Sequence, residues 1–383
     1  MNTAKQHIEP GNSTASYAPL RLLLAAGGTG GHVYPAISIA EAVRELQPES
    51  EILFVGTRDR MEWKAVPKAG YKIQSVWISG FHRRLTPQNL LFPVKLLVSL
   101  FQSLSIVKRF KPDLLVACGG FAAGPVGWVA AKLGVPVVIQ EQNSFPGVTN
   151  RLLAKHASKI FTAFEAADDY LPEEKTELTG NPVRSVLSVM NKQDALDHFE
   201  FSPEQPVLLV LGGSGGAKAL NEAMISALDD LHDIQIIWQC GPGYFDDLKN
   251  RVDTKKHVTL RLTGYIDNMA AAYGAADLVL TRAGASTCSE LMMTGKPSIL
   301  VPSPHVAGDH QTKNAKAMED TGASVLIAEE GLNNTLRQTV SELIADKEKL
   351  SEMSAAAGKM ARPDAAKIIA KYLLELAKSN TES

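Results

Sequence analysis

The sequence predicts an α/β protein with two domains, each built on a parallel β-sheet that helices cover on both faces. Three observations lead to this fold class. The chain has 383 residues, which is more than a single hydrophobic core usually serves. Short apolar segments alternate with longer amphipathic ones, a pattern typical of strands buried on both sides. The alternation also restarts midway, where a strand runs for a second time into a glycine-rich turn.

The predicted strands are short apolar runs bounded by turn residues. The first series consists of Leu22–Ala26, Ile52–Val55, Leu114–Ala117, Val135–Glu141 and Lys159–Thr162. The second series consists of Val207–Leu211, Ile234–Gln239, Val258–Leu262, Leu278–Thr281, Ser298–Val301 and Ala323–Ile327. Helices are expected in the amphipathic segments between them.

Turn residues at Gly180–Val183 mark the expected boundary between the two domains. We assign residues 1–19 to a flexible leader, 20–183 to an N-terminal domain and 184–363 to a C-terminal domain. The amphipathic segment 364–378 either closes the second domain or crosses back onto the first, and we adopt the second alternative.

Composition narrows the classes of function. The net charge of −2 argues against bulk nucleic-acid binding. Cys118, Cys240 and Cys288 are odd in number and far apart, which predicts a reducing compartment without disulfides. No Cys/His cluster has the spacing of a zinc site, so no metal site is expected. Residues 1–19 lack the apolar core of a signal peptide, and we expect a cytoplasmic protein.

The glycine-rich turns at residues 27–31 and 212–216 are the main candidates for ligand binding. Glycine permits positive φ and lets backbone N–H groups approach a ligand closely. The N-terminus of the helix that follows each turn favours a phosphate. A tight connection without a ligand is the alternative, but two such turns in matching positions favour binding. Ligands of such sheets bind beyond the carboxyl ends of the strands, so both turns are expected at one interdomain cleft.

Two common nucleotide-binding motifs are absent. A dinucleotide fingerprint starting at Gly28 and Gly30 would end on Val33, and the second strand leads into Gly56 and Thr57 without the acidic residue that binds ribose. The chain contains neither a Walker motif nor an Asp-x-Asp pair. Helix dipoles and side-chain donors are therefore expected to stabilise a leaving diphosphate. No cofactor should be required, although a divalent ion can still stimulate turnover.

Three segments carry candidate side chains, each with an alternative explanation. His32 can act as a general base or can pack at a helix start, and its place beside the glycine turn favours the base. Glu290 fits a T-x-x-E capping box with Thr287 or can bind a ribose diol, and the residues leave both alternatives open. Gln311 can bind sugar hydroxyls, whereas Asp309 is by itself better explained as a helix cap.

Taken together, the motifs resemble the MurG family of GlcNAc transferases from about residue 20 to about residue 375. The matching segments are Gly27–His32, Gln140–Asn143, Gly180–Arg184, Gly212–Ala217, Arg282–Glu290 and His310–Gln311. The resemblance implies a GT-B fold, in which two Rossmann-like domains face a central cleft. It implies inverting transfer of GlcNAc from UDP-GlcNAc to the C4 hydroxyl of MurNAc in undecaprenyl-linked lipid I. The product would be lipid II, a precursor of the bacterial cell wall.

The resemblance also implies roles for single residues. Ser214 would contact the diphosphate, and Ile266 and Met269 would lie near the uracil. Glu290 would hold the ribose and Gln311 the GlcNAc hydroxyls. The full implied substrate-binding set is Thr29, Gly30, Gly31, Asn143, Arg184, Ser214, Ile266, Met269, Glu290 and Gln311.

In this family pattern the first turn is expected to face the acceptor's diphosphate and the second turn the donor's. His32 is the family's candidate base, aimed at the acceptor hydroxyl across the cleft. Two features depart from the pattern. The leader 1–19 has no counterpart, and His310 stands where some members carry a second glutamine.

The segment Trp77–Val107 combines apolar residues with the basic pair Arg83 and Arg84. A membrane-spanning helix needs about 20 apolar residues, and Pro93 and Lys95 interrupt this run. One alternative is a core helix beside a basic loop, and the other is a patch that lies on an anionic membrane surface. A lipid-linked acceptor favours the patch, so a peripheral protein on the cytoplasmic face of the inner membrane is expected.

Two other classes of function share part of this pattern. Non-hydrolysing UDP-GlcNAc epimerases have the same two-domain plan but lack these glycine-turn sequences. A sugar-nucleotide-binding module, or one half of a two-subunit transferase, is the non-enzyme alternative. The presence of both halves in one chain argues against a half-transferase.

Overall fold

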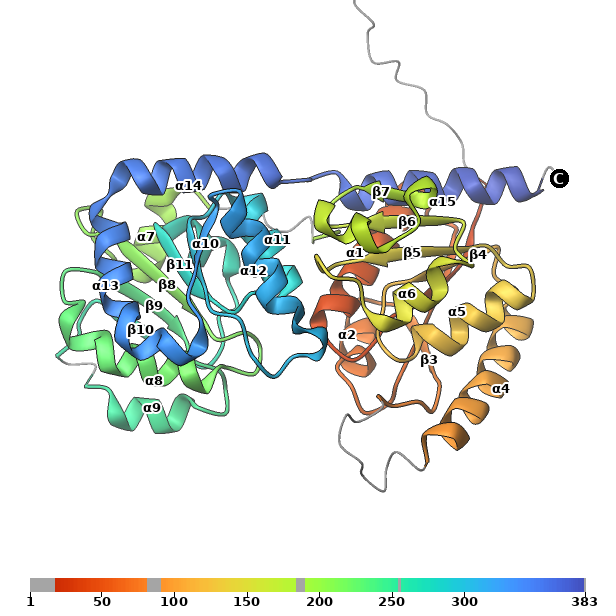
Figure 1. The fold of residues 1–383 in the computed structure, drawn as a ribbon, viewed down its shortest axis with the longest axis horizontal. Helices are drawn as coiled ribbons and strands as arrows, with labels where there is room; N and C mark the ends of the chain where they lie inside the picture. The colour runs from red at the N-terminus through yellow and green to blue at the C-terminus, as the bar shows by residue number, and fades with distance from the viewer. Residues whose placement is uncertain (1–17, 81–90, 184–189, 254–255, 382–383) are drawn as a thin grey trace, which may run out of the picture.

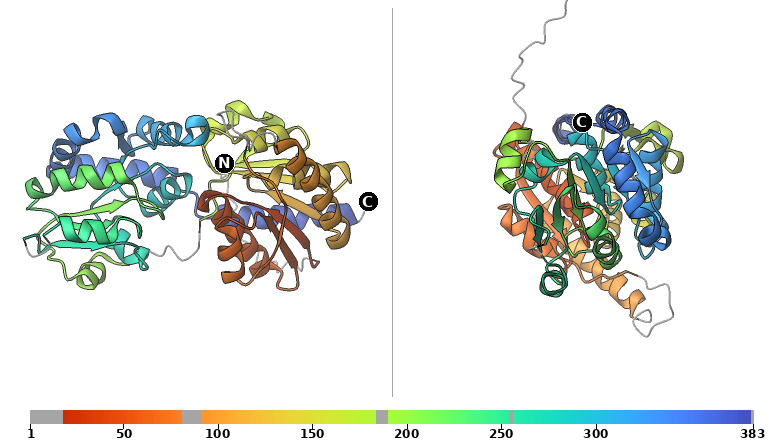
Figure 2. Two further views of the ribbon diagram at one scale, coloured as in Figure 1. Left: turned by 90° about the horizontal axis from the view of Figure 1, so that it is seen from below. Right: turned by 90° about the vertical axis from the view of Figure 1, so that its left-hand side faces the viewer.

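The computed structural model describes residues 18–80, 91–183, 190–253 and 256–381, which form two lobes side by side (Figure 1). Each lobe contains one parallel β-sheet with helices on both faces, as the two views in Figure 2 also show. This architecture confirms the predicted α/β class and the pair of Rossmann-like domains.

The first sheet contains seven parallel strands within the described ranges, in the order β3-β2-β1-β4-β5-β6-β7. Its strands are β1 (Arg21–Ala25), β2 (Glu51–Gly56), β3 (Lys72–Ser75), β4 (Leu114–Ala117), β5 (Val137–Glu141), β6 (Lys159–Thr162) and β7 (Thr176–Leu178). The central strands β1, β4 and β5 are buried on both faces, which explains their continuous apolar sequences.

The second sheet repeats this plan with six parallel strands among the described residues, in the order β10-β9-β8-β11-β12-β13. Its strands are β8 (Val207–Leu211), β9 (Gln235–Gln239), β10 (Leu260–Thr263), β11 (Leu278–Thr281), β12 (Ser298–Leu300) and β13 (Ser324–Leu326). The strand order reverses between β1 and β4 in the first sheet and between β8 and β11 in the second. Ligands bind at such reversals, and the glycine turns follow β1 and β8 at these points.

Helices cover both faces of each sheet. The N-terminal domain contains α1 (Gly30–Leu46), α2 (Glu62–Lys68), α4 (Phe92–Phe110), α5 (Ala123–Lys132) and α6 (Val148–Ala154), with the 3₁₀ helices η1 (Glu165–Tyr170) and η2 (Glu173–Lys175). The C-terminal domain contains α7 (Lys192–Phe199), α8 (Lys218–Ala227), α9 (Phe245–Arg251), α10 (Met269–Ala275), α11 (Ala285–Thr294), α12 (His310–Asp320), α13 (Leu332–Ala345) and α14 (Lys347–Met360). Its 3₁₀ helices are η3 (Leu228–Asp230), η4 (Ala307–Asp309) and η5 (Glu329–Gly331).

The last helix, α15 (Ala365–Thr381), leaves the C-terminal domain and packs against α1 (Figure 1). Its apolar side includes Ile369 and Leu373, both fully buried in the same cluster as Leu22 of β1. Residues from the C-terminal end of the chain therefore complete the core of the N-terminal domain.

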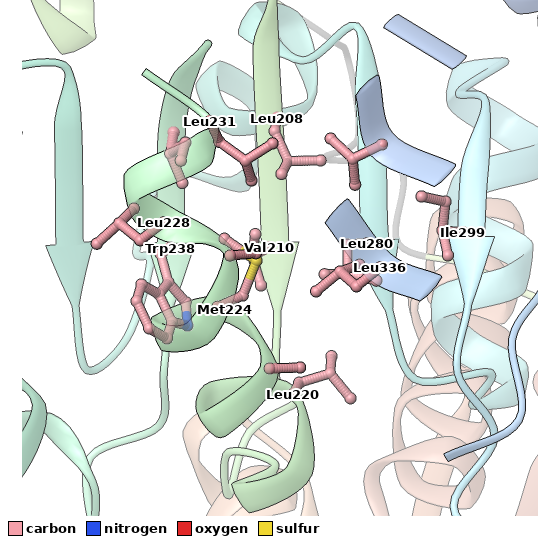
Figure 3. Packing of buried hydrophobic residues seen from close by; sticks show 14 of the residues in the cluster. Leu208, Val210, Leu220, Met224, Leu228, Leu231, Trp238, Leu280, Ile299 and Leu336 are labelled. Atoms are coloured by element: carbon pink, nitrogen blue, oxygen red, sulfur yellow. The ribbon is translucent and has the colours of Figure 1, made fainter. Parts of the chain in front are cut away.

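One of the two buried clusters of the C-terminal domain lies between its sheet and helices α8 and α13 (Figure 3), and the other lies on the opposite face of the sheet. Trp238 is fully buried in the first of these clusters, and its indole N–H donates to the side-chain oxygen of Asn221 at 3.2 Å. Asn221 in turn donates to the carbonyl of Cys240 at 3.0 Å, at the end of β9. This pairing gives the buried polar atoms partners and fixes α8, which follows the second glycine turn, against the sheet.

The predicted strands are found in the structure, with ends that differ by up to two residues, but β3 and β7 were not predicted. The sequence of β3, Lys72–Ser75, contains one apolar residue, and β7 is three residues long. Both strands lie at the edges of the first sheet, where less apolar surface is buried.

Candidate active site

The first glycine turn is held by a buried carboxylate that the sequence analysis missed. Glu62 of α2 is fully buried and accepts hydrogen bonds from the backbone N–H of Gly28 at 3.1 Å and of Thr57 at 2.9 Å. A Cβ added to Gly27 would lie 2.6 Å from Glu62 Oε1, and one added to Gly56 would lie 2.6 Å from Glu62 Cγ. Glycine at both positions therefore makes room for the carboxylate.

His32 lies in the first turn of α1, directly after the glycine turn. Its Nδ1 is within hydrogen-bond distance of the hydroxyl oxygen of the exposed Thr29, at 3.1 Å. The opposite side of the ring packs against Gly119, where an added Cβ would lie 3.0 Å from Nε2. Gly119 has φ +96°, a conformation that favours glycine. Nδ1 is therefore the ring nitrogen on the open side of the site.

The surroundings of His32 keep it neutral at physiological pH. Burial lowers the pKa of the imidazole below its ordinary value of 6.5, and the positive charge of His310 lowers it further. The carboxylates Glu141 and Glu62, and a hydrogen bond with the backbone of Gly27, act in the opposite direction. The net result is a deprotonated imidazole, which is the form that can accept a proton.

Glu141, the last residue of β5, organises the loop that carries the predicted site residue Asn143. It is buried and accepts hydrogen bonds from the backbone N–H of Asn143 and of Gly147, both at 3.0 Å. The side-chain amide of Asn150 donates to the same carboxylate at 2.8 Å. Burial raises the pKa of the nearby Cys118 thiol and the charge of Glu141 raises it further, so this thiol stays protonated.

The second glycine turn is held by an uncharged side chain. Gln239, at the end of β9, donates from Nε2 to the carbonyl of Gly213 at 3.0 Å and accepts at Oε1 from the N–H of Ile266, also at 3.0 Å. Ser214 lies at the exposed tip of this turn. Gln239 thus brings the turn with Ser214 next to the loop with Ile266, as the predicted donor site requires.

The structure excludes one of the two alternatives for Glu290. Helix α11 begins at Ala285 with Gly284 as its N-cap, so Thr287 lies inside the helix and the capping-box interpretation is wrong. Glu290 accepts a hydrogen bond at 2.8 Å from the hydroxyl of Tyr273 in α10, the helix that starts at Met269. Burial raises the pKa of Tyr273, and the charge of Glu290 raises it further.

Gln311 and Asp309 lie where β12 leads into α12. Gln311 Oε1 accepts a hydrogen bond at 2.8 Å from the backbone N–H of Ser303, which fixes its side chain beside this loop. Asp309 occupies the N-cap position with φ +54°, but its carboxylate makes no capping bond and accepts instead from the hydroxyl of Thr312 at 2.6 Å. The side-chain cap predicted for Asp309 is therefore wrong.

Asn314 of α12 connects the two domains. It is fully buried, and its Oδ1 accepts from both the backbone N–H and the hydroxyl of Ser144, each at 2.9 Å. Its Nδ2 donates to the carbonyl of Ala283 at 3.2 Å. The starts of α1 and α11 also face each other, because a Cβ added to Gly31 would lie 4.0 Å from Ser286 Oγ.

The described site residues lie in both domains, which contact each other at α1 and α11 and at the loop with Asn143 and α12. The N-terminal domain carries Thr29, Gly30, Gly31, His32 and Asn143, and the C-terminal domain carries Ser214, Ile266, Met269, Glu290 and Gln311. Arg184 lies outside the described residues.

Three findings complete this description of the site. The sequence analysis missed Gly119, although a glycine pair directly after the β4 strand and Cys118 could have indicated it. In the part of the chain that the structure describes, no group of three or more His, Cys, Asp or Glu side chains is placed to hold a metal ion. No helix within those ranges is both long and apolar enough to cross a membrane.

Comparison with protein-family models identifies two matching domains. The model described as the glycosyltransferase family 28 N-terminal domain matches residues 22–162, and the model for the C-terminal domain of the same family matches residues 207–369. The first match spans β1 to β6 of the first sheet, and the second spans all the described strands of the second sheet.

Two relatives with similar sequences have the same name. The UDP-N-acetylglucosamine–N-acetylmuramyl-(pentapeptide) pyrophosphoryl-undecaprenol N-acetylglucosamine transferase of Flavobacterium psychrophilum is 45% identical over 363 residues, which cover 94% of this chain and 98% of that protein. The protein of the same name from Salinibacter ruber is 45% identical and covers 93% of this chain and 96% of its own length.

Solved structures show the same fold. MurG of Acinetobacter baumannii has a TM-score of 0.75 at 31% identity, covering 92% of this chain and 99% of its own. The UDP-GlcNAc 2-epimerase of Neisseria meningitidis has a TM-score of 0.63 at 14% identity, which shows a shared fold alone. With both family models matched and full-length relatives at 45% identity, the chain belongs to glycosyltransferase family 28, among the MurG GlcNAc transferases.

Proposed function

We propose that this protein transfers GlcNAc from UDP-GlcNAc to the MurNAc sugar of lipid I, which forms lipid II for peptidoglycan synthesis. The observation that carries the proposal is the glycine turn at the strand-order reversal of each sheet, on a chain whose relatives over nearly full length are named for this reaction. The two turns supply what such a transfer needs: a place for a nucleotide diphosphate and a neutral imidazole next to the acceptor.

The proposed residue roles follow from the chemistry of each side. The uncharged turn that carries Ser214 would bind the donor diphosphate, with Ile266 and Met269 near the uracil, Glu290 on the ribose and Gln311 on the sugar. On the other side, Nδ1 of His32 would accept the proton of the C4 hydroxyl as it attacks the anomeric carbon. UDP leaves from the opposite face of that carbon, and the configuration inverts.

We propose that helix N-termini and side-chain donors, and no required cofactor, stabilise the leaving diphosphate. The absence of an Asp-x-Asp pair from the sequence supports this proposal. Turnover should then persist in excess EDTA. Any decrease in turnover should be no larger than the increase that divalent ions provide. Complete loss in EDTA, restored by one metal, would contradict it.

The decisive experiment uses radiolabelled UDP-GlcNAc with a lipid I analogue. Label that moves into the lipid product supports the transferase. Release of labelled ManNAc without lipid labelling would indicate an epimerase, and binding without turnover would indicate a sugar-nucleotide-binding module.

We further propose that the protein binds peripherally to the anionic surface of the cytoplasmic face of the inner membrane. Large apolar side chains are exposed on α4 and on α5, which packs against it: Leu97 is 59% exposed, Phe101 72% and Trp128 43%. Lys132 lies 5.7 Å from the ring of Trp128, so a cation borders this apolar surface. Apolar area combined with nearby basic charge is what anionic bilayers bind.

Co-sedimentation with liposomes that contain anionic lipid tests the membrane proposal. Phe101→Glu should reduce binding, whereas Val258→Glu, an equally exposed apolar position on the other domain, should not. Arg83→Glu with Arg84→Glu, which lie outside the described residues, should reduce binding as well. Binding unaffected by all of these changes would contradict the proposal.

A further inference from the structure

Phe145, in the loop after β5, lies beneath one cation from each domain. The Nζ of Lys313 in α12 is 3.1 Å from the centre of the Phe145 ring, and the guanidinium carbon of Arg151 in α6 is 4.9 Å from it. Tyr170 packs edge-on against Phe145, with ring centres 4.8 Å apart, and Lys313 lies 5.6 Å from its ring. We call these four side chains, Phe145, Arg151, Tyr170 and Lys313, the aromatic clasp.

Two members of the aromatic clasp, Phe145 and Lys313, lie on the same segments as predicted donor-binding residues. Lys313 stands two positions after Gln311 in the first turns of α12. Phe145 stands two positions after Asn143, in the loop that Glu141 folds. The hydrogen bonds from Ser144 to Asn314 join these segments, so the clasp extends an existing interdomain contact.

We propose that Lys313 is a positioning residue for the transferase reaction. By holding the start of α12 against the loop 143–145, it would place Gln311 opposite Asn143 and favour the arrangement of the two domains described above, which we call the closed arrangement. A cation over an aromatic face is attracted by the ring's electrons at distances up to about 6 Å. Lys313 supplies this attraction across the domain interface. The kinetic part of the inference rests on the proposed donor roles of Asn143 and Gln311, whereas the closure does not.

Arg151 provides a matched control for Lys313 within the aromatic clasp. Arg151 contacts the same ring, but it belongs to the same domain as Phe145, so its attraction does not depend on closure. Lys313→Met removes the charge and keeps most of the side-chain length, and Lys313→Arg keeps the charge. Arg151→Met removes a cation from the ring without removing an interdomain contact. Melting temperatures of the three variants establish that each one folds.

The first measurement is the distance between the domains, by double electron–electron resonance. Spin labels on Lys155→Cys and Ser351→Cys, both at exposed positions on different domains, report it, and the native cysteines Cys118, Cys240 and Cys288 are buried. In Lys313→Met the distance distribution should become broader or extend to longer distances. In Lys313→Arg and Arg151→Met the distribution should match that of the parent protein. An unchanged distribution in Lys313→Met would overturn the proposal, whatever the enzyme's activity.

The second measurement is steady-state kinetics with UDP-GlcNAc and a lipid I analogue. Lys313→Met should raise KM for UDP-GlcNAc roughly 3- to 30-fold, the range of a cation–aromatic contact converted to a ratio. The kcat at saturating donor should change less than about 2-fold, because bound donor restores closure by mass action. An equal rise of KM in Arg151→Met, or no rescue by Lys313→Arg, would contradict an interdomain role. Absence of transfer by the parent protein would instead refute the proposed function.

Discussion

The two glycine turns follow equivalent strands, yet side chains of different charge hold them. At the first turn, the Glu62 carboxylate occupies the N–H of Gly28 and places a negative charge beneath the loop. At the second turn, the neutral Gln239 binds the carbonyl of Gly213 and adds no charge. An anion is therefore better accommodated at the second turn, whereas the first is suited to a histidine. We therefore expect the two turns to serve different purposes, with the charge of the supporting side chain as the difference between them.

The largest effect should come from His32, in the first turn of the helix that follows the first glycine turn. His32→Ala should lower kcat by about 10²- to 10⁴-fold, the usual contribution of a general base. UDP affinity, measured calorimetrically, should hardly change because the nucleotide would bind at the other turn. His232→Ala, at an exposed position, is the control. Weaker UDP binding with unchanged turnover at saturation would assign His32 a structural role.

The pH profile sharpens the same comparison. A base must be deprotonated, and the pKa of His32 is lowered below 6.5 by burial and by His310. The kcat/KM, whose pH dependence reports the free enzyme, should therefore stay constant as pH falls through 6.5 and decline only below the lowered pKa, by up to about tenfold per unit. Because His310 lowers the pKa of His32, His310→Ala should raise that pKa. The decline in activity should then begin at higher pH. A profile that falls already at pH 7 would exclude a neutral His32.

Exchanging the charge of the two supporting side chains tests the comparison directly. Gln239→Glu should weaken UDP binding roughly 10- to 100-fold, because a carboxylate would repel the diphosphate at short range. Glu62→Gln should leave UDP binding unchanged but lower the free energy of unfolding by about 1–2 kcal/mol, since charged hydrogen bonds to Gly28 and Thr57 become neutral ones. Similar effects of both variants on UDP affinity would show that the turns do not differ as described.

Glu290→Gln should have a smaller effect on the donor side. The change keeps the shape of the side chain but removes the charge that would bind the ribose diol, so UDP affinity should fall about 5- to 10-fold. Thermal unfolding should move little, because α11 does not use Glu290 as a cap. A large loss of stability with unchanged UDP affinity would indicate that Glu290 has a structural role.

The smallest effect should follow from removing the partner of Glu290. Tyr273→Phe deletes the hydroxyl that donates to this carboxylate and leaves the ring in place. The free energy of unfolding should fall by about 0.5–1.5 kcal/mol, and UDP affinity should fall less than in Glu290→Gln. Denaturant titration and calorimetry measure the two quantities. A greater loss of UDP affinity than in Glu290→Gln would assign the nucleotide contact to Tyr273 itself.

The features of the fold that depend on local sequence pattern could be predicted. Continuous apolar runs identify the central strands, and glycines directly after them identify the two turns. Partners that are distant along the chain could not be predicted. Glu62 and Gly28 are 34 residues apart, and Asn314 and Ser144 are 170 apart. The capping-box pattern at Thr287 failed because the helix starts three residues earlier than that pattern requires. The assignment of His32 as the base stays a prediction.

The return of α15 to the N-terminal domain has a consequence for biosynthesis. The first domain to leave the ribosome cannot bury the surface of α1 until Ile369 and Leu373 have been synthesised. The described strands of the C-terminal sheet are synthesised before α15, so during that part of translation apolar side chains of α1 stay open to water or to a chaperone. The domain made first is thus the last to be finished.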